Sequence, residues 1–545
     1  MRTNLWRISV LFLMGACAAP STHAPGSTGG DSGEEGGSGG TSPPANTGGR
    51  TATGGTPATG GATGGSSAGG GTGGNEDPPD ASTGTGGAGA GGAGGVSADG
   101  SAPPDLGPIP EAPPPAGEPP TCKRKVPVTS LQALSGAIAA AMPGDCIVLA
   151  NGTYASTGVI SINKVGTAND RITITAETIG GVTISGTGGF RLDSPAAFVV
   201  VRGFKFTHAG TVVMDLGTHN CTITRNVFEL GGTGTYLRID GLDQEASYNS
   251  FQNKTSAGSM VQIDASGRSH AGTQRPYLHH NHWYKHNFTG GNGGECIATW
   301  GGFTRAEYNL FEECNGDPEI ITAKSSDGIY RYNTFRNSTR GMFSFRYGNR
   351  ITAEGNFFFG LAGGIRAYGT DHKIINNYFE GNKGVGIYVS NGAADGTYIQ
   401  IQRMLIANNT LVNDSISPRG GDLPPMTVTI ANNIIKKDSG TFASEGAGWT
   451  GTKWEGNIFW GAATTTIPAS GYKKVDPLLT AAGGVSHIGA GSPAIDASVG
   501  SYGVMEDMDG QPRSGTPDVG ADEVSTSPVK RRPLTAADVG PMAGL

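Results

Sequence analysis

Two acidic residues and a lysine lie close together in the segment 314–325, Cys-Asn-Gly-Asp-Pro-Glu-Ile-Ile-Thr-Ala-Lys-Ser. Asp317 and Glu319 are two positions apart, so both carboxylates point to the same side of an extended segment. Carboxylate oxygens with an amide oxygen nearby are ligands that suit Ca²⁺ and suit zinc poorly. Lys324 follows in the same segment. Taken alone, this pattern favours a structural ion pair over a metal site.

The stretch from Lys324 to Lys373 is basic in an otherwise acidic chain. It holds eight Lys and Arg against three acids, whereas the whole chain has a formal net charge of −7. The basic residues are Lys324, Arg331, Arg336, Arg340, Arg346, Arg350, Arg366 and Lys373. A basic groove on an exported protein predicts a polyanionic chain as ligand, and a solvated charged face is the alternative. The acidic balance argues against a nucleic-acid partner.

Asn recurs through most of the chain, each time with an apolar residue two positions later. The pairs are Asn226 and Phe228, Asn249 and Phe251, Asn281 and Trp283, Asn309 and Phe311, Asn333 and Phe335, Asn356 and Phe358, Asn377 and Phe379, Asn409 and Leu411, Asn433 and Ile435, and Asn457 and Phe459. Their spacings are 23, 32, 28, 24, 23, 21, 32, 24 and 24 residues. Short β-branched and aromatic segments between Gly, Asn and Asp turns predict about three strands per repeat.

This period predicts an all-β fold, a right-handed parallel β-helix whose coils stack at about 4.8 Å. The Asn side chains would form a ladder at one turn of every coil, and the apolar residues would stack inside. A leucine-rich repeat would need Leu at fixed positions that are missing, and a WD40 propeller needs about 40 residues per blade. Residues 131–141 are the one clear helical segment, which we expect to cap the open end of the coils.

Four histidines lie in the segment 279–286, His-His-Asn-His-Trp-Tyr-Lys-His. The composition suggests a zinc site, but no HExxH-type pattern accompanies it. Asn281 is a ladder position, so His280 and His282 flank it on opposite faces. We therefore expect a structural role for these histidines, or a place along a groove.

The first 120 residues lack the composition of a folded domain. Residues 1–17 have the pattern of an export signal, with Arg2 and Arg7 before an apolar run and then small residues. Met14-Gly-Ala-Cys17 resembles a lipobox, which predicts lipidation of Cys17 and an outer-membrane or cell-surface lipoprotein. Ordinary cleavage, which would leave a periplasmic or secreted protein, is the alternative. Residues 18–120 are rich in Gly, Ser, Thr and Pro, which predicts a disordered tether.

We expect residues 121–525 to form one β-helix domain and residues 526–545 to form a C-terminal tail. No apolar run after the export signal is long enough to span a membrane, and we expect a monomer. Setting Cys17 aside, the remaining cysteines are Cys122, Cys146, Cys221, Cys296 and Cys314. Export permits disulfides. Cys122–Cys146 is the first expected pair and Cys296–Cys314 is the second.

Several motifs occur in order along the chain. They are Pro143-Gly-Asp-Cys-Ile-Val-Leu-Ala-Asn-Gly-Thr-Tyr154, Gly291-Asn-Gly-Gly-Glu295, Glu319-Ile-Ile-Thr-Ala-Lys-Ser325, Phe345-Arg-Tyr-Gly348 and Gly355-Asn-Phe-Phe-Phe-Gly360. They resemble polysaccharide lyase family six, which comprises the alginate lyases and chondroitinase B. The resemblance covers residues 125–390 and continues more loosely to 532–541. It implies a β-helix enzyme that acts on an anionic polysaccharide with Ca²⁺ as cofactor.

The resemblance also assigns roles to single residues. The implied site comprises catalytic Lys324 and Arg346, Ca²⁺ ligands Asn292, Asp317 and Glu319, and substrate-binding Arg350, Arg366 and His372. Three departures from the family pattern stand out. Asp317 replaces a usual Glu, Tyr347 replaces a common His, and Ile297-Ala-Thr-Trp300 replaces an Arg-containing stretch. The last departure leaves the assignment of Asn292 and the substrate preference open.

The implied reaction is β-elimination of a 4-linked uronic acid polymer. Ca²⁺ would neutralise the uronate carboxylate, and a neutral Lys324 would take the C5 proton. Arg346 would stabilise the leaving 4-oxygen, or protonate it by relaying a proton from water. Alginate is the favoured substrate and dermatan sulfate the second choice. Two other classes stay open: a glycoside hydrolase that uses Asp317 and Glu319 without a metal, and a surface protein that binds polyanions without cleaving them.

Overall fold

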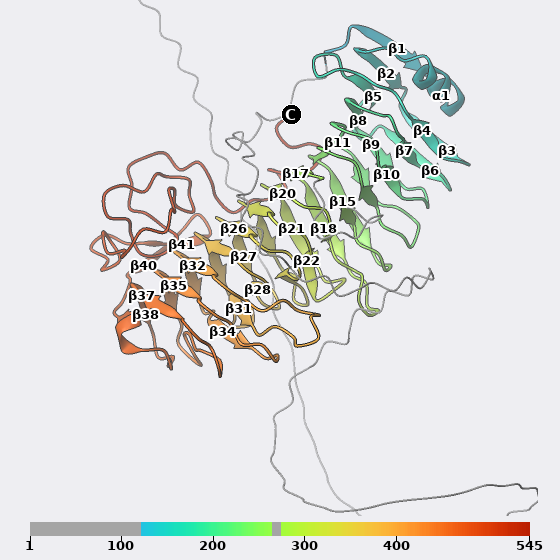
Figure 1. Cartoon of the computed structure of the whole chain (residues 1–545). Helices are drawn as coiled ribbons and strands as arrows, with labels where there is room; N and C mark the ends of the chain where they lie inside the picture. The colour runs from blue at the N-terminus through green and yellow to red at the C-terminus, as the bar shows by residue number, and fades with distance from the viewer. Residues whose placement is uncertain (1–120, 264–273) are drawn as a thin grey trace, which may run out of the picture. The chain divides into compact units, whose positions relative to one another are not determined.

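Stacked parallel strands form the body of the protein. The computed structural model describes residues 121–263 and 274–545. Within these residues, sheets A and B have 14 strands each and sheet C has 11, and every pairing inside the three sheets is parallel. Successive coils lie side by side along one axis (Figure 1). The predicted all-β parallel β-helix is therefore confirmed.

Each full coil contributes one strand to each sheet. Sheet A contains β1 (Arg124–Val128), β2 (Asp145–Leu149), β5 (Ile172–Ala176), β8 (Val199–Arg202), β11 (Thr222–Thr224), β14 (Glu245–Ser247), β17 (Tyr277–His279), β20 (Arg305–Glu307), β23 (Ile329–Arg331), β26 (Thr352–Glu354), β29 (Lys373–Ile375), β32 (Leu405–Ala407), β35 (Thr429–Ala431) and β37 (Lys453–Glu455). Sheet B contains β3 (Gly152–Ser156), β6 (Val182–Gly186), β9 (Phe204–Phe206), β12 (Val227–Phe228), β15 (Ser250–Lys254), β18 (His282–His286), β21 (Leu310–Cys314), β24 (Thr334–Arg336), β27 (Phe357–Phe359), β30 (Tyr378–Glu380), β33 (Thr410–Val412), β36 (Ile434–Lys436), β38 (Asn457–Trp460) and β39 (Tyr472–Lys474). Sheet C contains β4 (Ile160–Ile162), β7 (Phe190–Leu192), β10 (Val212–Met214), β13 (Leu237–Ile239), β16 (Val261–Ile263), β19 (Ile297–Thr299), β22 (Glu319–Ala323), β25 (Met342–Phe345), β28 (Ile365–Ala367), β31 (Ile387–Ser390) and β34 (Ile416–Arg419).

The ten predicted Asn form one continuous ladder at the turn between sheets A and B. Each Asn Oδ1 accepts hydrogens from the backbone N–H and the side-chain amide of the preceding Asn, as between Asn309 and Asn333 at 3.0 Å for both bonds. Asn333 continues the ladder to Asn356 in the same way. The ladder side chains are fully buried. They satisfy backbone groups that the turn would otherwise leave unpaired.

The residue before every ladder Asn adopts the left-handed conformation, with φ between +52° and +64°. This conformation turns the chain from sheet A into sheet B, and it is costly for residues other than Gly. Tyr248, His280 and Tyr308 occupy it in successive coils, and their rings stack at 4.8 and 5.2 Å. The sequence pattern did not indicate this outer stack.

The apolar residues of the repeat stack inside the coils, as predicted. From Phe228 to Phe379 seven aromatic rings follow one another at centroid distances of 4.6–5.3 Å. This spacing matches the distance between neighbouring strands. The stack forms part of one continuous hydrophobic core that extends from the first coils to the last.

The N-terminal end of the coils is covered by α1 (Leu131–Ala139). Ser130 caps the helix, because its Oγ accepts the N–H of Ala133 at 3.1 Å. Leu134 and Ile138 are buried against the first coils. The predicted helical cap is confirmed, although the helix ends two residues before Ala141. Both expected disulfides are present, with Cα–Cα distances of 5.5 Å for Cys122–Cys146 and 6.5 Å for Cys296–Cys314.

The regular coils end at β39, earlier than the predicted boundary at residue 525. The repeat of Asn and apolar residues stops at Asn457, so no later segment can continue the ladder. The chain passes through η1 (Ala469–Gly471) and β39, and then forms an antiparallel hairpin of β40 (Leu479–Ala482) and β41 (Val485–Ile488). The hairpin packs on the outside of the coils. There Val485 of the hairpin and the later Met508 belong to one buried cluster with Tyr378.

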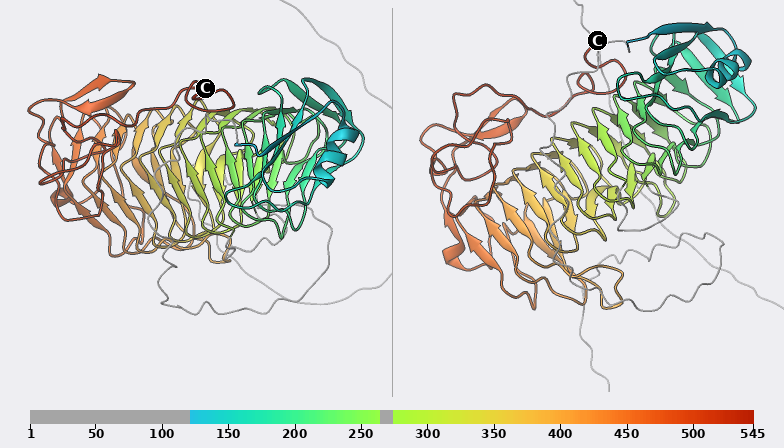
Figure 2. Two further views of the ribbon diagram at one scale, coloured as in Figure 1. Left: turned by 90° about the horizontal axis from the view of Figure 1, so that it is seen from above. Right: turned by 45° about the horizontal axis from the view of Figure 1, so that its top comes forward.

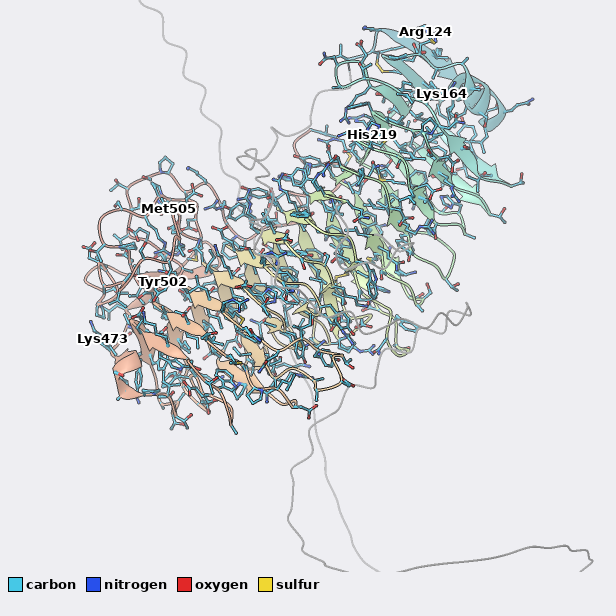
Figure 3. The ribbon with its side chains drawn as sticks, in the orientation of Figure 1. Arg124, Lys164, His219, Lys473, Tyr502 and Met505 are labelled. Carbon is cyan, nitrogen blue, oxygen red and sulfur yellow. A yellow bond between two sulfur atoms is a disulfide. The ribbon has the colours of Figure 1, made fainter. Side chains whose placement is uncertain are left out.

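The C-terminal tail runs back over the coils towards the N-terminal end (Figure 2). Arg336 donates to the carbonyl of Leu534 at 2.6 Å, and Arg225 donates to those of Pro541 and Ala543 at 2.8 and 2.9 Å. The tail therefore lies across the outer stack of aromatic rings. Figure 3 shows the two ends of the β-helix, with Arg124 in the first coil and Lys473 in the last.

The predicted export signal, Cys17 and the linker 18–120 lie outside the described residues. Among the residues that the structure does describe, no helix is long and apolar enough to cross a membrane.

Asn333→Ala tests the ladder, because it deletes the side-chain amide bond to Asn356 and leaves the N–H and the side-chain amide of Asn309 without their acceptor. Unpaired buried polar groups predict a loss of about 2–4 kcal/mol in the free energy of unfolding. Chemical denaturation measures this, with Asn169→Ala as the control at an exposed Asn outside the ladder. Equal stability of the two variants would contradict the role of the ladder.

Candidate active site

The outward face of sheet C carries the predicted catalytic pair. Ala323 and Phe345 point into the core, so the residues that follow them point outward. The backbone N–H of Lys324 donates to Thr299 in the preceding coil at 3.0 Å, and that of Arg346 donates to Ala323 at 2.8 Å. Lys324 and Arg346 therefore occupy equivalent positions in neighbouring coils. The fold brings them together from positions 22 residues apart in the sequence.

Lys324 lies at the edge of a pocket of about 430 Å³ on this face. The pocket is lined by Thr235, Ala257, Gly258, Ser259, Gln262, Gly293, Glu295, Ala298, Trp300, Lys324 and Tyr347. The Lys324 Nζ lies 4.2 Å from the centroid of the Trp300 ring. Trp300 precedes Lys324 by one coil, so the replaced stretch at 297–300 supplies an aromatic wall to this pocket.

The two predicted acidic ligands are buried beside Lys324 and Arg346. Asp317 Oδ2 accepts the N–H of Gly293 at 2.8 Å, and its Oδ1 accepts the N–H of Glu319 at 3.0 Å. Glu319 forms ion pairs with Arg346, at 3.1 Å, and with Arg366. The structural ion pair that the sequence pattern favoured is thus present, and it involves two arginines.

Glu295 is a third buried acid that the sequence reasoning did not assign. β19 pairs with β22 so that Glu295 lies one coil below Glu319. Thr322 Oγ1 donates to Glu319 at 2.5 Å and lies 3.5 Å from Glu295, which also accepts the Ser259 hydroxyl at 3.0 Å. The sequence feature that could have identified Glu295 is its place at the end of the Gly-Asn-Gly-Gly-Glu motif. Asn292, in the same motif, is exposed.

The three carboxyl groups have very different proton affinities. Burial, followed by the charge of Asp317, raises the pKa of Glu295 to about 7. Burial and the neighbouring Glu319 also raise the pKa of Asp317. Burial opposes ionisation of Glu319 as well, but Arg366 and Arg346 outweigh it and lower the pKa of Glu319 to about 2. Glu319 is therefore ionised at neutral pH, while Glu295 and Asp317 lack equivalent cationic partners.

These donors suit Ca²⁺ in type, but they do not converge on one point. Buried carboxylate oxygens that raise one another's pKa are the hard ligands that a calcium ion stabilises. Their ligand atoms, however, are not within 4.8 Å of one another as a group of three. Glu319 is drawn towards Arg346 and Arg366. Calcium binding would therefore require Glu319 to be shared between the cation and the arginines.

The three predicted substrate-binding residues have different surroundings. Arg366 is buried on sheet C and contacts Glu319 and Ser344. Arg350 is exposed at a turn and pairs with Asp327 at 2.7 Å. His372 is fully buried, and its ring nitrogens contact the backbone at Ile351 and Tyr368. The position of His372 therefore does not support substrate binding, because both nitrogens already have backbone partners.

The basic stretch 324–373 does not form one groove. Arg331 and Lys373 lie in sheet A and Arg336 lies in sheet B, whereas Lys324, Arg346 and Arg366 lie on sheet C. Arg331 is paired with Glu307. Each coil turns through three faces, so charges that are close in sequence are separated in space. The groove prediction holds only for the residues on sheet C.

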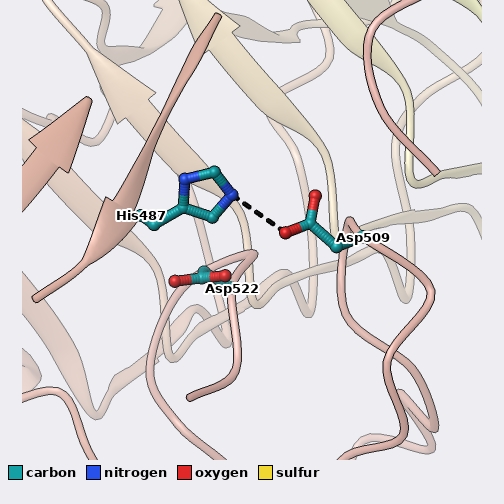
Figure 4. Close-up of side chains that lie close together, drawn as sticks. All are labelled: His487, Asp509 and Asp522. Atoms are coloured by element: carbon teal, nitrogen blue, oxygen red, sulfur yellow. Dashed lines mark hydrogen bonds and ion pairs between the residues drawn. The ribbon is translucent and has the colours of Figure 1, made fainter. Parts of the chain in front are cut away.

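The predicted structural role of the histidines in 279–286 agrees with their separation. His279 in sheet A contacts Glu245 at 3.3 Å, whereas His282 in sheet B contacts Glu312 at 2.8 Å. A different group, His487, Asp509 and Asp522, converges beyond the coils (Figure 4). His487 Nε2 lies 2.9 Å from Asp509. Among the described residues it is the one cluster whose ligand atoms all lie within 4.8 Å, and it is not on sheet C.

The fold and the site together define a β-helix protein whose sheet face combines a lysine, two arginines and three carboxyl groups beside a pocket. The sequence model of the chondroitinase B family matches residues 128–482. The chain therefore belongs to the chondroitinase B family. No curated protein sequence matches it.

Solved structures similar to this chain are described as polysaccharide lyases of family PL6. A mutant of the PL6 family alginate lyase AlyGC is 25% identical, with a TM-score of 0.63. The match covers 76% of this chain and 58% of AlyGC, so the chain spans little more than half the length of that relative. The lyase Pedsa3628 from Pseudopedobacter saltans is 20% identical with a TM-score of 0.53, covering 77% of this chain and 100% of its own. The latter likeness shows the fold alone.

Arg366→Ala tests the buried ion pairs around Glu319. Removing one partner leaves a buried carboxylate with less compensation, which predicts a loss of about 3 kcal/mol in the free energy of unfolding. Arg350→Ala is the matched control, because its ion pair is at the surface and is expected to contribute only about 0–1 kcal/mol. Similar losses in denaturant titrations of both variants would contradict the burial argument.

Proposed function

We propose that this protein is a polysaccharide lyase that cleaves a 4-linked uronic acid polymer by β-elimination. The observation that carries the proposal is that Lys324, which lines the pocket, and Arg346 occupy equivalent positions in neighbouring coils. Lys324 accepts the C5 proton. Arg346 stabilises the oxygen that leaves from C4. The product carries a C4–C5 double bond, and no water is added.

Alginate is the proposed substrate and dermatan sulfate is the alternative. The 25% identical relative AlyGC is described as an alginate lyase, which favours alginate. A sulfated polymer calls for additional cationic positions along the groove. Arg331, Arg336 and Arg350 do not supply them, because each forms an ion pair with an acidic residue of this chain. The description of the matching family, chondroitinase B, keeps dermatan sulfate as the second polymer to test.

A glycoside hydrolase at the same face is the less favourable alternative. Such an enzyme needs one protonated and one ionised carboxyl group at the scissile bond. Glu319 is tied to two arginines, and Lys324 and Arg346 would have no role. A protein that binds polyanions without cleaving them would use the same charges but release no product.

The proposal is tested by incubating the purified protein with alginate, dermatan sulfate and an uncharged polysaccharide. Elimination produces the ultraviolet absorbance of an unsaturated uronate, which hydrolysis does not produce. We expect this absorbance to rise with alginate. New reducing ends without absorbance would support a hydrolase, and binding without either signal would support a surface receptor.

Lys324→Ala is expected to reduce kcat by about 10²–10⁴-fold, because it removes the group that accepts the C5 proton. Arg346→Lys keeps a positive charge but loses the guanidinium geometry, and it should also reduce kcat. Lys473→Ala, at the far end of the coils, is the matched control (Figure 3). Near-normal turnover by Lys324→Ala, measured by ultraviolet absorbance, would place the base elsewhere.

Calcium is the proposed cofactor, held by Asp317 and Glu319 with Glu295 or Asn292 as a further ligand. When bound, Ca²⁺ would neutralise the uronate carboxylate and make the C5 proton more acidic. The burial of Glu295 beside Glu319 favours Glu295 over the exposed Asn292. If calcium takes no part, the arginines around Glu319 would neutralise the carboxylate instead.

Chelator is expected to suppress turnover, and Ca²⁺ is expected to restore it more fully than Mg²⁺, which demands a regular octahedral site. Asp317→Ala should raise the Ca²⁺ concentration needed for half-maximal activity, and titration calorimetry should show weaker binding. Glu295→Gln should weaken binding more than Asn292→Ala does. Activity that survives both chelator and Asp317→Ala would contradict the proposed role of calcium. It would leave the proposed lyase reaction unaffected.

The location of the protein is proposed from the N-terminal sequence. The apolar run 8–14 and the lipobox-like Met14-Gly-Ala-Cys17 support export and lipid anchoring through Cys17. The Gly-rich residues 18–120 would then act as a tether between a membrane surface and the β-helix.

A further inference from the structure

Arg346 is poorly suited to supply the proton that the leaving 4-oxygen needs. A guanidinium stays protonated in proteins, so it stabilises negative charge without readily giving up a hydrogen ion. It is also held in place by Glu319 at 3.1 Å. β-Elimination from an ether oxygen therefore calls for a second group next to Arg346 that can release a proton.

Tyr398 lies next to Arg346 and carries such a proton. Arg346 Nη2 donates to the Tyr398 hydroxyl at 3.2 Å, and its guanidinium carbon lies 5.2 Å from the centroid of the Tyr398 ring. The Tyr398 ring stacks on that of Tyr368 at a centroid distance of 4.4 Å. Tyr368 follows Arg346 by one coil in the same outward column of sheet C. The hydroxyl is thus fixed at the face that carries the catalytic pair.

A long loop delivers Tyr398 to this position. The coil between Asn377 and Asn409 spans 32 residues, whereas the next coil spans 24. Within the loop, the N–H of Ala393 donates to the carbonyl of Tyr398 at 2.9 Å. Gly392 pairs with Leu423 of the following coil, and the N–H of Ala394 donates to Asp422 at 3.1 Å. These bonds hold the extra residues against the next coil.

The contact with Arg346 leaves the Tyr398 hydroxyl able to donate. In that contact the guanidinium gives the hydrogen and the phenol oxygen accepts it, so the phenol keeps its own O–H. Burial raises the pKa of Tyr398, and the charges of Arg346 and Arg366 partly oppose this effect. The phenol therefore stays protonated at neutral pH, while the adjacent positive charge stabilises the phenolate once it forms.

We propose that the Tyr398 hydroxyl donates the proton to the leaving 4-oxygen, with Arg346 binding both oxygens. This inference rests on the proposed function. Lys324 takes the C5 proton, the C4–O4 bond breaks as the C4–C5 double bond forms, and O4 takes the phenolic proton. The Tyr398 phenolate then recovers a proton from water, and Lys324 loses its extra proton to water. The reaction needs no oxidant or other co-reactant.

Tyr398→Phe tests the proposal, because it removes only the hydroxyl and keeps the ring stacked on Tyr368. Two substrates are compared: alginate, and a uronate of the same configuration with fluoride at C4. Fluoride leaves as an anion and needs no proton from the enzyme. We expect kcat on alginate to fall by about 10²–10⁴-fold, with KM within about threefold of the unmodified enzyme. Turnover of the fluoride substrate should stay within about threefold.

Two controls accompany the comparison. Lys324→Ala should lose turnover of both substrates, since the C5 proton must be removed in either case. Tyr388→Phe makes the same change at a tyrosine on β31 of sheet C, in a strand beyond the catalytic pair, and should leave both rates unchanged. Thermal unfolding of the variants checks that they are folded.

Equal losses on both substrates would overturn the proposal, because they would show that Tyr398 only positions Arg346 or the loop. Unchanged turnover of alginate by Tyr398→Phe would overturn it as well. An unmodified enzyme that cleaves no uronate substrate would instead refute the proposed function, and the inference would fall with it.

Discussion

Hydrogen bonds between successive coils are the constraint on which the rest of the structure depends. They fix each residue directly above its counterpart in the preceding coil, at the spacing of neighbouring strands. The Asn ladder maintains this register at the turn between sheets A and B, where the residue before each Asn is in the left-handed region. Because the register holds, Trp300, Lys324 and Arg346 form a column, although their neighbours in sequence face other directions. The arrangement of the site is thus a consequence of stacking, with one register irregularity between Glu319 and Ile321 where β22 pairs with β25.

Burial and compensation decide the electrostatics of this column. Three buried carboxyl groups lie close to this column, those of Glu295, Asp317 and Glu319. Of the three, Glu319 is the one that forms ion pairs with arginines. The remaining two, Glu295 and Asp317, are left with raised pKa values, so this part of the site favours an added positive charge. A calcium ion, or the proton itself, can supply that charge. The same arginine that compensates Glu319 contacts Tyr398, so one guanidinium links the acidic cluster to the proposed proton donor.

The sequence alone predicts the fold well, because a repeating Asn with a buried partner has few structural solutions. It also indicates that Lys324, Asp317 and Glu319 lie close together, since they belong to one short segment, and the structure places Arg346 beside them. The sequence does not predict how the turns of each coil separate neighbouring residues in space. The basic stretch 324–373 looks like one surface, yet its residues turn onto three faces. His372 looks available, yet backbone groups engage its ring. Tyr398 is far from Arg346 in sequence and lies in a loop without a motif. Only the folded structure shows that the two side chains are in contact.

Isotope labelling of the solvent tests the central claim most directly. If the sheet C face performs β-elimination, no oxygen atom from water enters the cleaved polymer. Digestion of alginate in water enriched with heavy oxygen, followed by mass spectrometry of the fragments, should therefore show unsaturated ends without label. Incorporation of one solvent oxygen per cleaved bond, with saturated ends, would show hydrolysis instead and would contradict the account.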